Sequence, residues 1–220
     1  MGILDRTYAW LDERFELTPI LEKQLYSKRV PKHALNPIYC FGGITLVTFV
    51  MQVLSGILLA MYYKPTPETA HASIEFIMTE IRYGAYMRSL HFWGANLMIV
   101  FIFLHMIRVY FTAAYKKPRE LNWVVGCLLL AVTLTFGFSG YLLPWDQIAF
   151  WATTVGTEMT GAVPVIGHDL LVMLRGGPLV SEYTLNRFYA LHVLVLPIIL
   201  AMLLSVHFIM IRIQGISGEL

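Results

Sequence analysis

Four long stretches of the chain contain no Asp, Glu, Lys or Arg. They enclose 31, 19, 25 and 24 residues and lie between Lys32 and Lys64, Arg88 and Arg108, Glu120 and Asp146, and Arg187 and Arg212. A helix that crosses a bilayer needs about 20 mainly apolar residues, so each stretch can form one span. We therefore predict four transmembrane helices, near residues 38–63, 87–113, 121–143 and 188–211.

The segments outside these spans predict helices on the membrane surface. Residues 1–37 mix apolar and charged positions at helical spacing, and Thr18 followed by Pro19 is typical of a helix restart. Residues 147–180 are apolar but interrupted by Pro and Gly, which favours short amphipathic helices over a fifth span. The predicted fold class is an all-α integral membrane protein. It has a four-helix bundle at 38–213, surface helices at 1–37 and about 147–180, and a tail at 214–220.

Composition excludes several other classes of protein. Only 14% of the residues are charged, whereas soluble domains have about 25%, so a soluble enzyme or a nucleic-acid binder is excluded. Neither Cys40 nor Cys127 belongs to a CxxC pair, which excludes the common zinc sites and an ordinary c-type haem attachment. No signal peptide is expected, because Asp5, Arg6 and Asp12 fall where its apolar region would lie.

The distribution of Lys and Arg predicts the orientation in the membrane. Eleven of the sixteen lie in the N-terminal segment, the 108–119 region and the tail, and five lie on the opposite side. Because basic residues favour the cytoplasmic side, both termini should lie on this electronegative (n) side. The second and fourth spans then run parallel, from the positive (p) side to the n side.

Four histidines lie deep inside two of the spans, where ionisable residues are costly and usually functional. His91 and His105 are 14 residues apart on the second span, and His192 and His207 are 15 apart on the fourth. These spacings correspond to about 21 and about 22 Å along a helix. Each pair stays within roughly 60° of one helix face. We therefore expect His91 to face His192 near the p side, and His105 to face His207 near the n side.

Two imidazoles at one depth on facing helices can supply both axial ligands of one haem iron, so the two levels predict two stacked haem b groups. Glycines on the two spans without deep histidines support this interpretation. Gly42 and Gly56 are 14 residues apart, as are Gly126 and Gly140, and glycine lets the backbone approach a flat macrocycle. The alternatives are histidines hydrogen-bonded within a bundle, a proton relay, and ordinary packing of small residues between helices.

Several motifs resemble those of the cytochrome b6 family, the short cytochromes b of quinol-oxidising b6f and related bacterial complexes. They are Asn36-Pro37-Ile38-Tyr39-Cys40-Phe41-Gly42-Gly43, Arg88-Ser89-Leu90-His91, Lys116-Lys117-Pro118-Arg119-Glu120-Leu121, Gly140-Tyr141-Leu142-Leu143-Pro144-Trp145-Asp146-Gln147 and Gln214-Gly215-Ile216-Ser217-Gly218. The 15-residue histidine spacing is also similar to this branch, whereas the mitochondrial type has 14.

The resemblance implies specific cofactors and sites. His91 and His192 would bind the p-side haem b, His105 and His207 the n-side one, and Cys40 a third haem, of c type, through one thioether. The remaining implied positions are Arg88, Arg108 and Arg119 at haem propionates, Arg212 at an n-side quinone pocket, and Phe150 and Ala152 at a p-side quinol pocket. From the residues alone, a small buried Cys40 and interfacial anchoring arginines are alternatives. Cys127 matches no motif and is expected in the core.

The resemblance also implies partners and a role. The family's Pro-Glu-Trp-Tyr motif does not occur in this sequence, which implies a separate three-span subunit that carries it. A Rieske iron–sulfur protein, cytochrome f or another c-type cytochrome, a dimeric complex and membrane lipid complete the implied partners; no nucleic acid is implied. The implied function is electron transfer from quinol oxidation to quinone reduction, coupled to proton translocation, in a bacterial cell membrane or a thylakoid. The alternatives are a di-haem anchor of a hydrogenase or formate dehydrogenase, and a haem-free proton-coupled transporter.

Overall fold

The computed structural model describes residues 2–15, 18–19, 22 and 36–215. Most of the surface helix expected after Thr18, and residues 216–220 of the expected tail, lie outside these ranges. The chain divides into two units, residues 1–39 and 40–220. Within the first, α1 (Ile3–Phe15) has Asp5 in its first turn and Arg14 in its last. Each charge has the sign that interacts favourably with the helix dipole at that end.

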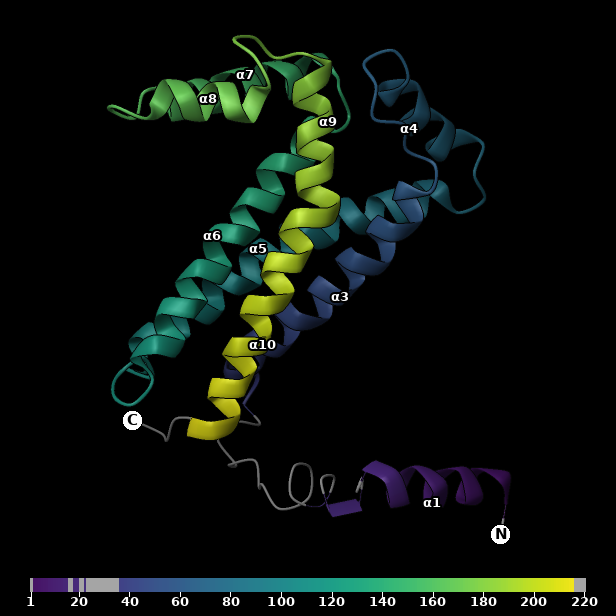
Figure 1. Ribbon diagram of the computed structural model, residues 1–220, viewed down its shortest axis with the longest axis vertical. Helices are drawn as coiled ribbons and strands as arrows, with labels where there is room; N and C mark the ends of the chain where they lie inside the picture. The colour runs from purple at the N-terminus through teal and green to yellow at the C-terminus, as the bar shows by residue number, and fades with distance from the viewer. Residues whose placement is uncertain (1, 16–17, 20–21, 23–35, 216–220) are drawn as a thin grey trace. The chain divides into compact units, whose positions relative to one another are not determined.

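The second unit is helical in its described part. After a short helical turn, η3 (Pro37–Cys40), its elements are α3 (Phe41–Ala60), α4 (Ala70–Thr79), α5 (Gly84–Phe111), α6 (Glu120–Leu142), α7 (Gln147–Gly161), α8 (Gly167–Arg175), α9 (Glu182–Ala190), η4 (Leu191–Val195) and α10 (Leu196–Gln214). Within the described ranges, four stretches are long and apolar enough to cross a membrane: Pro37–Ala60, Gly84–Phe111, Glu120–Leu142 and Glu182–Gln214 (Figure 1). The all-α, four-span fold class is confirmed.

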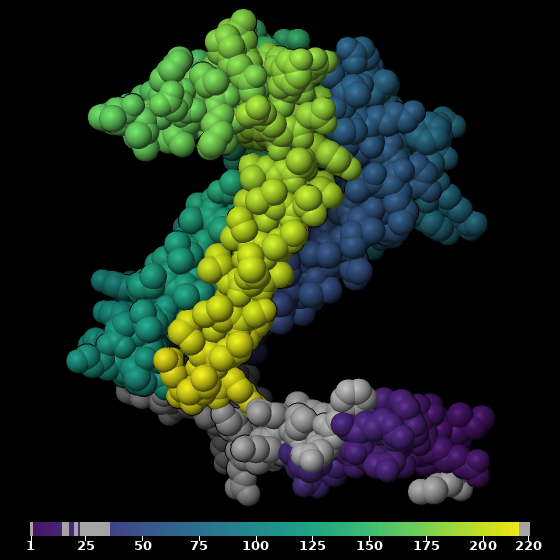
Figure 2. Space-filling model, in the orientation of Figure 1, coloured from purple at the N-terminus to yellow at the C-terminus, as the bar shows by residue number. Residues whose placement is uncertain are grey.

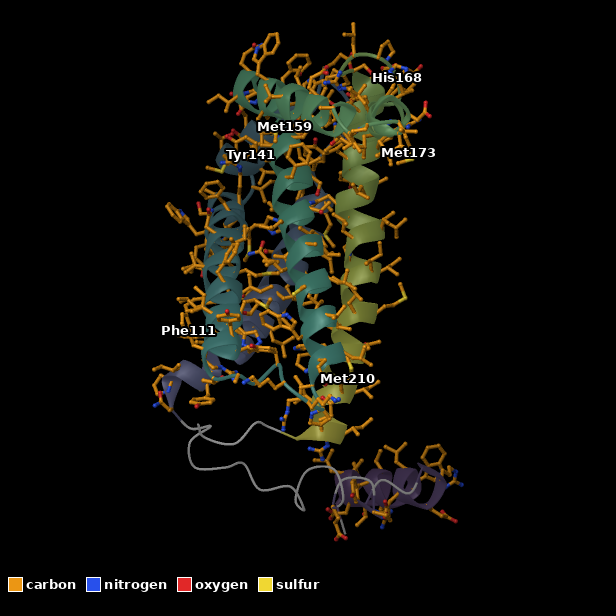
Figure 3. All side chains as sticks on the ribbon, turned by 90° about the vertical axis from the view of Figure 1, so that its left-hand side faces the viewer. Phe111, Tyr141, Met159, His168, Met173 and Met210 are labelled. Carbon is orange, nitrogen blue, oxygen red and sulfur yellow. The ribbon has the colours of Figure 1, made fainter. Side chains whose placement is uncertain are left out.

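The spans form two antiparallel pairs. α3 packs mainly on α5, and α10 packs mainly on α6; Figure 2 shows α10, in yellow, lying against α6, in teal. Phe111 at the end of α5 and Met210 near the end of α10 lie at the same end of the bundle, far from Met159 and His168 (Figure 3). The two histidine-bearing spans are therefore parallel, as expected.

The fourth span contains a π-helical turn. η4 covers Leu191–Val195 and includes His192, and Pro197 stands in the first turn of α10. A proline has no N–H to donate, and its ring collides with the carbonyl four residues earlier. The wider turn before Pro197 relieves this collision and takes up one extra residue, which is typical of π-turns at functional sites.

Apolar side chains fill the middle of the bundle. Met98 of α5, Leu129 of α6 and Leu200 of α10 are buried against one another. Met98 is seven residues from both His91 and His105, so this cluster lies midway between the two histidine levels.

Candidate functional site

His91 of α5 and His192 of η4 face each other inside the bundle. Their ring centroids are 6.4 Å apart and their planes are inclined by 71°. A metal–imidazole bond is about 2.0 Å and the centroid lies about 1.1 Å further, so two imidazoles on opposite sides of one metal ion have centroids about 6.2 Å apart. The observed separation fits two axial ligands of a single iron.

His105 of α5 and His207 of α10 form the second level. His105 lies beside Gly42 of α3 and His207 beside Gly126 of α6, and the parallel course of α5 and α10 brings the two rings to the same depth. Within the described ranges, no three His, Cys, Asp or Glu side chains are grouped to hold a metal ion. Each level thus offers two ligands, which suits an iron whose other four ligands come from a porphyrin.

Each of the four predicted glycines lies against one of these histidines. A Cβ atom placed on the glycine would come within 2.7 to 4.0 Å of the ring. The distances to Cε1 are 3.0 Å for Gly42 and His105, 3.2 Å for Gly56 and His91, 4.0 Å for Gly126 and His207, and 2.7 Å for Gly140 and His192. Gly42, Gly56 and Gly140 therefore make room for the histidine rings themselves, which is a closer relation than the sequence predicted, whereas a Cβ at Gly126 would make only an ordinary contact.

Two buried serines hydrogen-bond the histidines of one level only. The hydroxyl of Ser55 on α3 lies 2.9 Å from Nδ1 of His91, and that of Ser139 on α6 lies 3.0 Å from Nδ1 of His192. These two serines were not singled out from the sequence. The signal that marks them is the Ser-Gly pair that occurs at Gly56 and again at Gly140.

The two cysteines are both exposed. Cys40 is two residues before Gly42, which contacts His105, so its thiol lies near the His105–His207 level. Cys127 is on α6, and its exposure corrects the expectation that it belongs to the core.

The four predicted arginines lie at the two ends of the bundle and are all half-buried. Arg88 is three residues before His91, with its guanidinium 3.7 Å from the sulfur of Met78. Arg108, Arg119 and Arg212 lie at the opposite end. The guanidinium of Arg119 donates to the main-chain carbonyls of residues 214 and 215, at 3.4 Å each.

The two predicted quinol-pocket residues separate on α7. Ala152 lines a shallow, open apolar groove along one face of this helix, together with Trp151 and Val155. Phe150 is not among the residues that line this groove, and its ring packs on Trp145, 5.8 Å between centroids.

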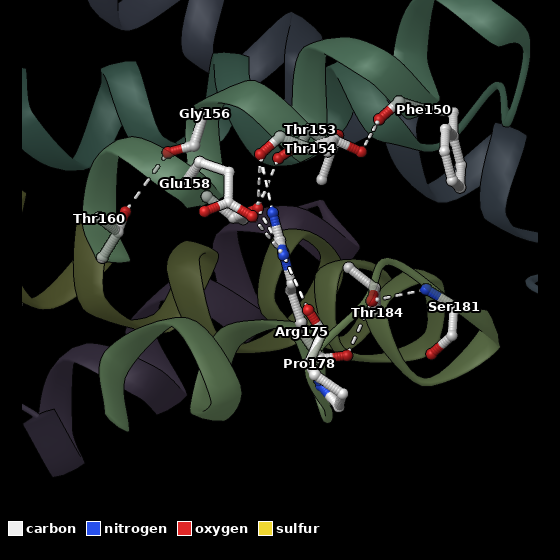
Figure 4. Close-up of polar contacts among 11 residues, drawn as sticks. Phe150, Thr153, Thr154, Gly156, Glu158, Thr160, Arg175, Pro178, Ser181 and Thr184 are labelled. Carbon is white, nitrogen blue, oxygen red and sulfur yellow. Dashed lines mark hydrogen bonds and ion pairs between the residues drawn. The ribbon is translucent and has the colours of Figure 1, made fainter. Parts of the chain in front are cut away.

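Arg175 was counted from the sequence only as a charge at one membrane face, but it is buried. Its guanidinium joins α7 to the end of α8, as Figure 4 shows. It donates to Thr157 Oγ1 at 2.7 Å, to the Thr154 carbonyl at 2.8 Å and to the Pro178 carbonyl at 3.0 Å. Glu158 pairs with it at 2.9 Å. The Arg175 carbonyl accepts from Thr184 of α9 at 2.7 Å, so one residue ties three surface elements together.

Two hydrogen bonds connect the loops at the His91–His192 end. The Tyr63 hydroxyl donates to the Leu143 carbonyl at 2.7 Å, and the His71 ring lies 3.2 Å from the Pro144 carbonyl. Burial raises the pKa of Tyr63 above its ordinary value, with the neighbouring Tyr189 adding to the shift. Like an ordinary tyrosine, the phenol is protonated in the physiological pH range and can donate this hydrogen bond.

Comparisons with known proteins show which family the chain resembles. The family model described as cytochrome b/b6/petB matches residues 25–215. The chain is 50% identical over 211 residues to the cytochrome b6 of Heliobacterium mobile, covering 96% of this chain and 99% of that protein. It is 46% identical over 217 residues to the cytochrome b6 of Synechococcus sp. (strain JA-3-3Ab), covering 99% and 100%. A solved chain of "Hyperthermophilic respiratory Complex III" superposes with a TM-score of 0.88 and 38% identity, over 96% of this chain and 56% of that one.

Proposed function

Because the chain belongs to the cytochrome b/b6 family, we propose that His91 and His192 hold one haem b and that His105 and His207 hold a second. The protein is a cytochrome b subunit of a b6f/bc-type complex and is integral to the membrane. Because the chain belongs to this family, we set aside the two alternatives, the hydrogenase-type anchor and the haem-free transporter.

The observation that carries the proposal is the repeated arrangement of helices around the four histidines. At each level one histidine comes from α5 and the other from the fourth span, and each ring has a glycine of α3 or α6 beside it. Packing of small residues alone does not explain why all four glycines meet these particular rings. Two histidines that would hold a planar group between them need fixed ring positions, and this requirement does explain it.

The orientation follows from the charge distribution, with the His91–His192 level near the p side and both termini on the n side. When bound, the two haems supply one-electron sites in the two halves of the bilayer, so that electrons from quinol oxidation on the p side reach quinone reduction on the n side. The apolar cluster around Met98 keeps water out of the space between the levels. Proton release and uptake at opposite faces then couple the reaction to a transmembrane potential.

Further cofactor contacts belong to the same proposal. Cys40 forms a single thioether to a third haem, of c type, on the n side, where its exposed thiol lies near the His105 level. Arg88, Arg108 and Arg119 neutralise haem propionates, since guanidinium groups pair well with carboxylates. Arg212 lines an n-side quinone pocket, and the groove at Ala152 contributes to a p-side quinol pocket.

The complete quinol-oxidation site requires other subunits. We propose a three-span subunit that carries the Pro-Glu-Trp-Tyr motif, a Rieske iron–sulfur protein and a cytochrome f or other c-type cytochrome, assembled as a dimer in the lipid bilayer. The chain alone is then an electron-transfer subunit and not a complete enzyme.

Spectra of purified protein test the histidine assignment. We expect a reduced-minus-oxidised difference spectrum with haem b absorbance for the unmodified chain. His207→Leu and His91→Leu should each remove one haem, from different levels, because a haem that loses one of two axial ligands is weakly held. The exposed His168 provides a matched control, so His168→Leu should retain both. Absence of haem b from the unmodified protein, or retention of both haems in His207→Leu, would refute the proposal.

The thioether has an independent test. On a denaturing gel stained for haem peroxidase activity, the unmodified chain should give a band, since a covalent haem survives denaturation. Cys40→Ser should abolish this band and Cys127→Ser, at the other exposed cysteine, should keep it. A stained band in Cys40→Ser would contradict the assignment.

A further inference from the structure

The two histidine levels differ in what surrounds the ring nitrogens. Ser55 is 2% exposed and Ser139 is fully buried, and each stands directly before the glycine that meets the same histidine. One serine comes from each antiparallel helix pair, so His91 and His192 receive equivalent contacts from opposite sides. Such a matched pair of buried hydroxyls requires a reason, because a buried polar group is costly unless it is hydrogen-bonded.

The site of iron binding on the ring determines the direction of these bonds. The Ser55 hydroxyl donates to the Met51 carbonyl at 2.6 Å, and the Ser139 hydroxyl donates to the Phe136 carbonyl at 3.2 Å. The proposed function places iron at Nε2 of each ring, so Nδ1 carries the proton. Each serine oxygen then accepts from Nδ1–H while its own hydrogen bonds a main-chain carbonyl.

The other level has no such serine hydroxyls. The residues before Gly42 and Gly126 are Phe41 and Val125, which have no hydroxyl. In the described part of the chain, Nδ1 of His105 is buried without a hydrogen-bond partner, and the His207 ring meets the main chain of Asn122 and no hydroxyl group. The Ser-Gly pair thus distinguishes one level of the bundle from the other.

We propose that Ser55 and Ser139 are positioning residues that lower the reduction potential of the haem held by His91 and His192 relative to that of the haem held by His105 and His207. The inference rests on the proposed function, because it requires a haem at each level. An acceptor on Nδ1–H makes the imidazole a more basic ligand, and a more basic ligand favours the ferric state, which carries the extra positive charge. The serine-to-carbonyl bond polarises the hydroxyl oxygen and strengthens this effect in a low dielectric.

A redox titration of the assembled complex, followed by the haem absorbance bands, tests the proposal. We expect Ser55→Ala and Ser139→Ala to raise the potential of the His91–His192 haem and to leave the other haem unchanged. The double variant should change the ratio of oxidised to reduced haem about tenfold at a fixed ambient potential, which is about 59 mV for one electron. Ser55→Thr keeps the hydroxyl and should restore the original potential.

Ser205→Ala is the matched control. Ser205 lies on α10, and its hydroxyl donates to the carbonyl of Ala201, four residues earlier, as Ser55 does to Met51. It is exposed, and among the described residues no histidine hydrogen-bonds it. It should change neither potential. If the alanine variants fail to assemble, Ser55→Cys supplies a weaker acceptor of similar size and should shift the same haem in the same direction. Unchanged potentials, or equal shifts of both haems, would overturn the inference. A chain that binds no haem b would instead refute the proposed function.

Discussion

Replacing Gly140 by alanine should selectively weaken haem binding at the His91–His192 level. The added Cβ would lie 2.7 Å from Cε1 of His192, whereas ordinary contacts begin at 3.4 Å. The ring would have to retreat by about 0.7 Å, or the helices would have to separate. Because the displaced ring is a proposed axial ligand, the penalty falls mainly on the haem-bound state.

The magnitude follows from two opposing effects. Overpacking a well-packed site by one methyl group costs about 1–3 kcal/mol, while alanine in place of glycine stabilises a helix by up to about 1 kcal/mol. The second effect acts with or without haem and therefore does not offset the first in haem affinity. A penalty of about 2 kcal/mol corresponds to roughly 30-fold weaker haem binding at this level.

The other glycines provide a graded series of controls. The gap to the facing ring widens from Gly140 through Gly42 and Gly56 to Gly126, where the added Cβ would lie 4.0 Å from His207. A Cβ at Gly43 would meet nothing within 4 Å, so Gly43→Ala should be neutral or slightly stabilising. Haem content per polypeptide and the temperature at which haem b absorbance is lost measure the order. If Gly126→Ala or Gly43→Ala loses as much haem as Gly140→Ala, steric contact with the ring is not the reason for these glycines.

Two further substitutions test the packing at the loop end of the bundle. Arg175→Leu should destabilise the surface helices by about 3 kcal/mol, because it leaves buried carbonyl and hydroxyl acceptors without their donor. Limited proteolysis within 147–180 should accelerate in this variant but not in Arg82→Leu, and equal rates in the two would contradict the role. Tyr63→Phe removes the hydrogen bond to Leu143 and should cost about 1 kcal/mol. Thermal unfolding in detergent should show the loss, with the exposed Tyr62→Phe as the unaffected reference.

Much of the architecture could be predicted from the charge pattern. A charge in the bilayer core is costly, so the few charged residues mark the membrane faces, and depth can be counted inward from them. This counting was sufficient to place His91 level with His192. It gave no information on the contacts of Arg175. This residue also lies at a membrane face, but it is buried there and donates to main-chain carbonyls. Three short helices meet at this point.

The sequence showed the equal glycine spacing in the two halves of the bundle, but not what these glycines contact. α3 and α6 share few residues, yet each carries two glycines 14 residues apart, with a serine before the second. Only the structure shows that these shared positions meet equivalent histidines on α5 and the fourth span. A flat group between two helix pairs constrains only the few positions that touch its ligands. α3 and α6 therefore share the spacing of these glycines and serines without being similar at their other positions.

The unequal histidine spacing on the two parallel spans has its explanation in η4. In a regular α-helix, 14 and 15 residues differ by about 100° in direction, so His192 and His207 could not both match the histidines of α5. The π-turn at Leu191–Val195 takes up the extra residue within one turn and removes the mismatch. Pro197, which requires the wider turn, was the available sequence signal.

Deleting one residue from this turn should therefore be tolerated. Without Leu194, the turn can close as a regular α-helical turn, and His192 and His207 become 14 residues apart, as His91 and His105 are. We expect the variant to retain both haem b signals. Deletion of Met202, an exposed residue in the regular part of α10, also gives a 14-residue spacing, but it leaves the π-turn in place and turns His207 by about 100° away from His105. That variant should lose the haem of the His105–His207 level. Equal haem loss in the two deletions would show that the π-turn does not set the alignment of the histidines.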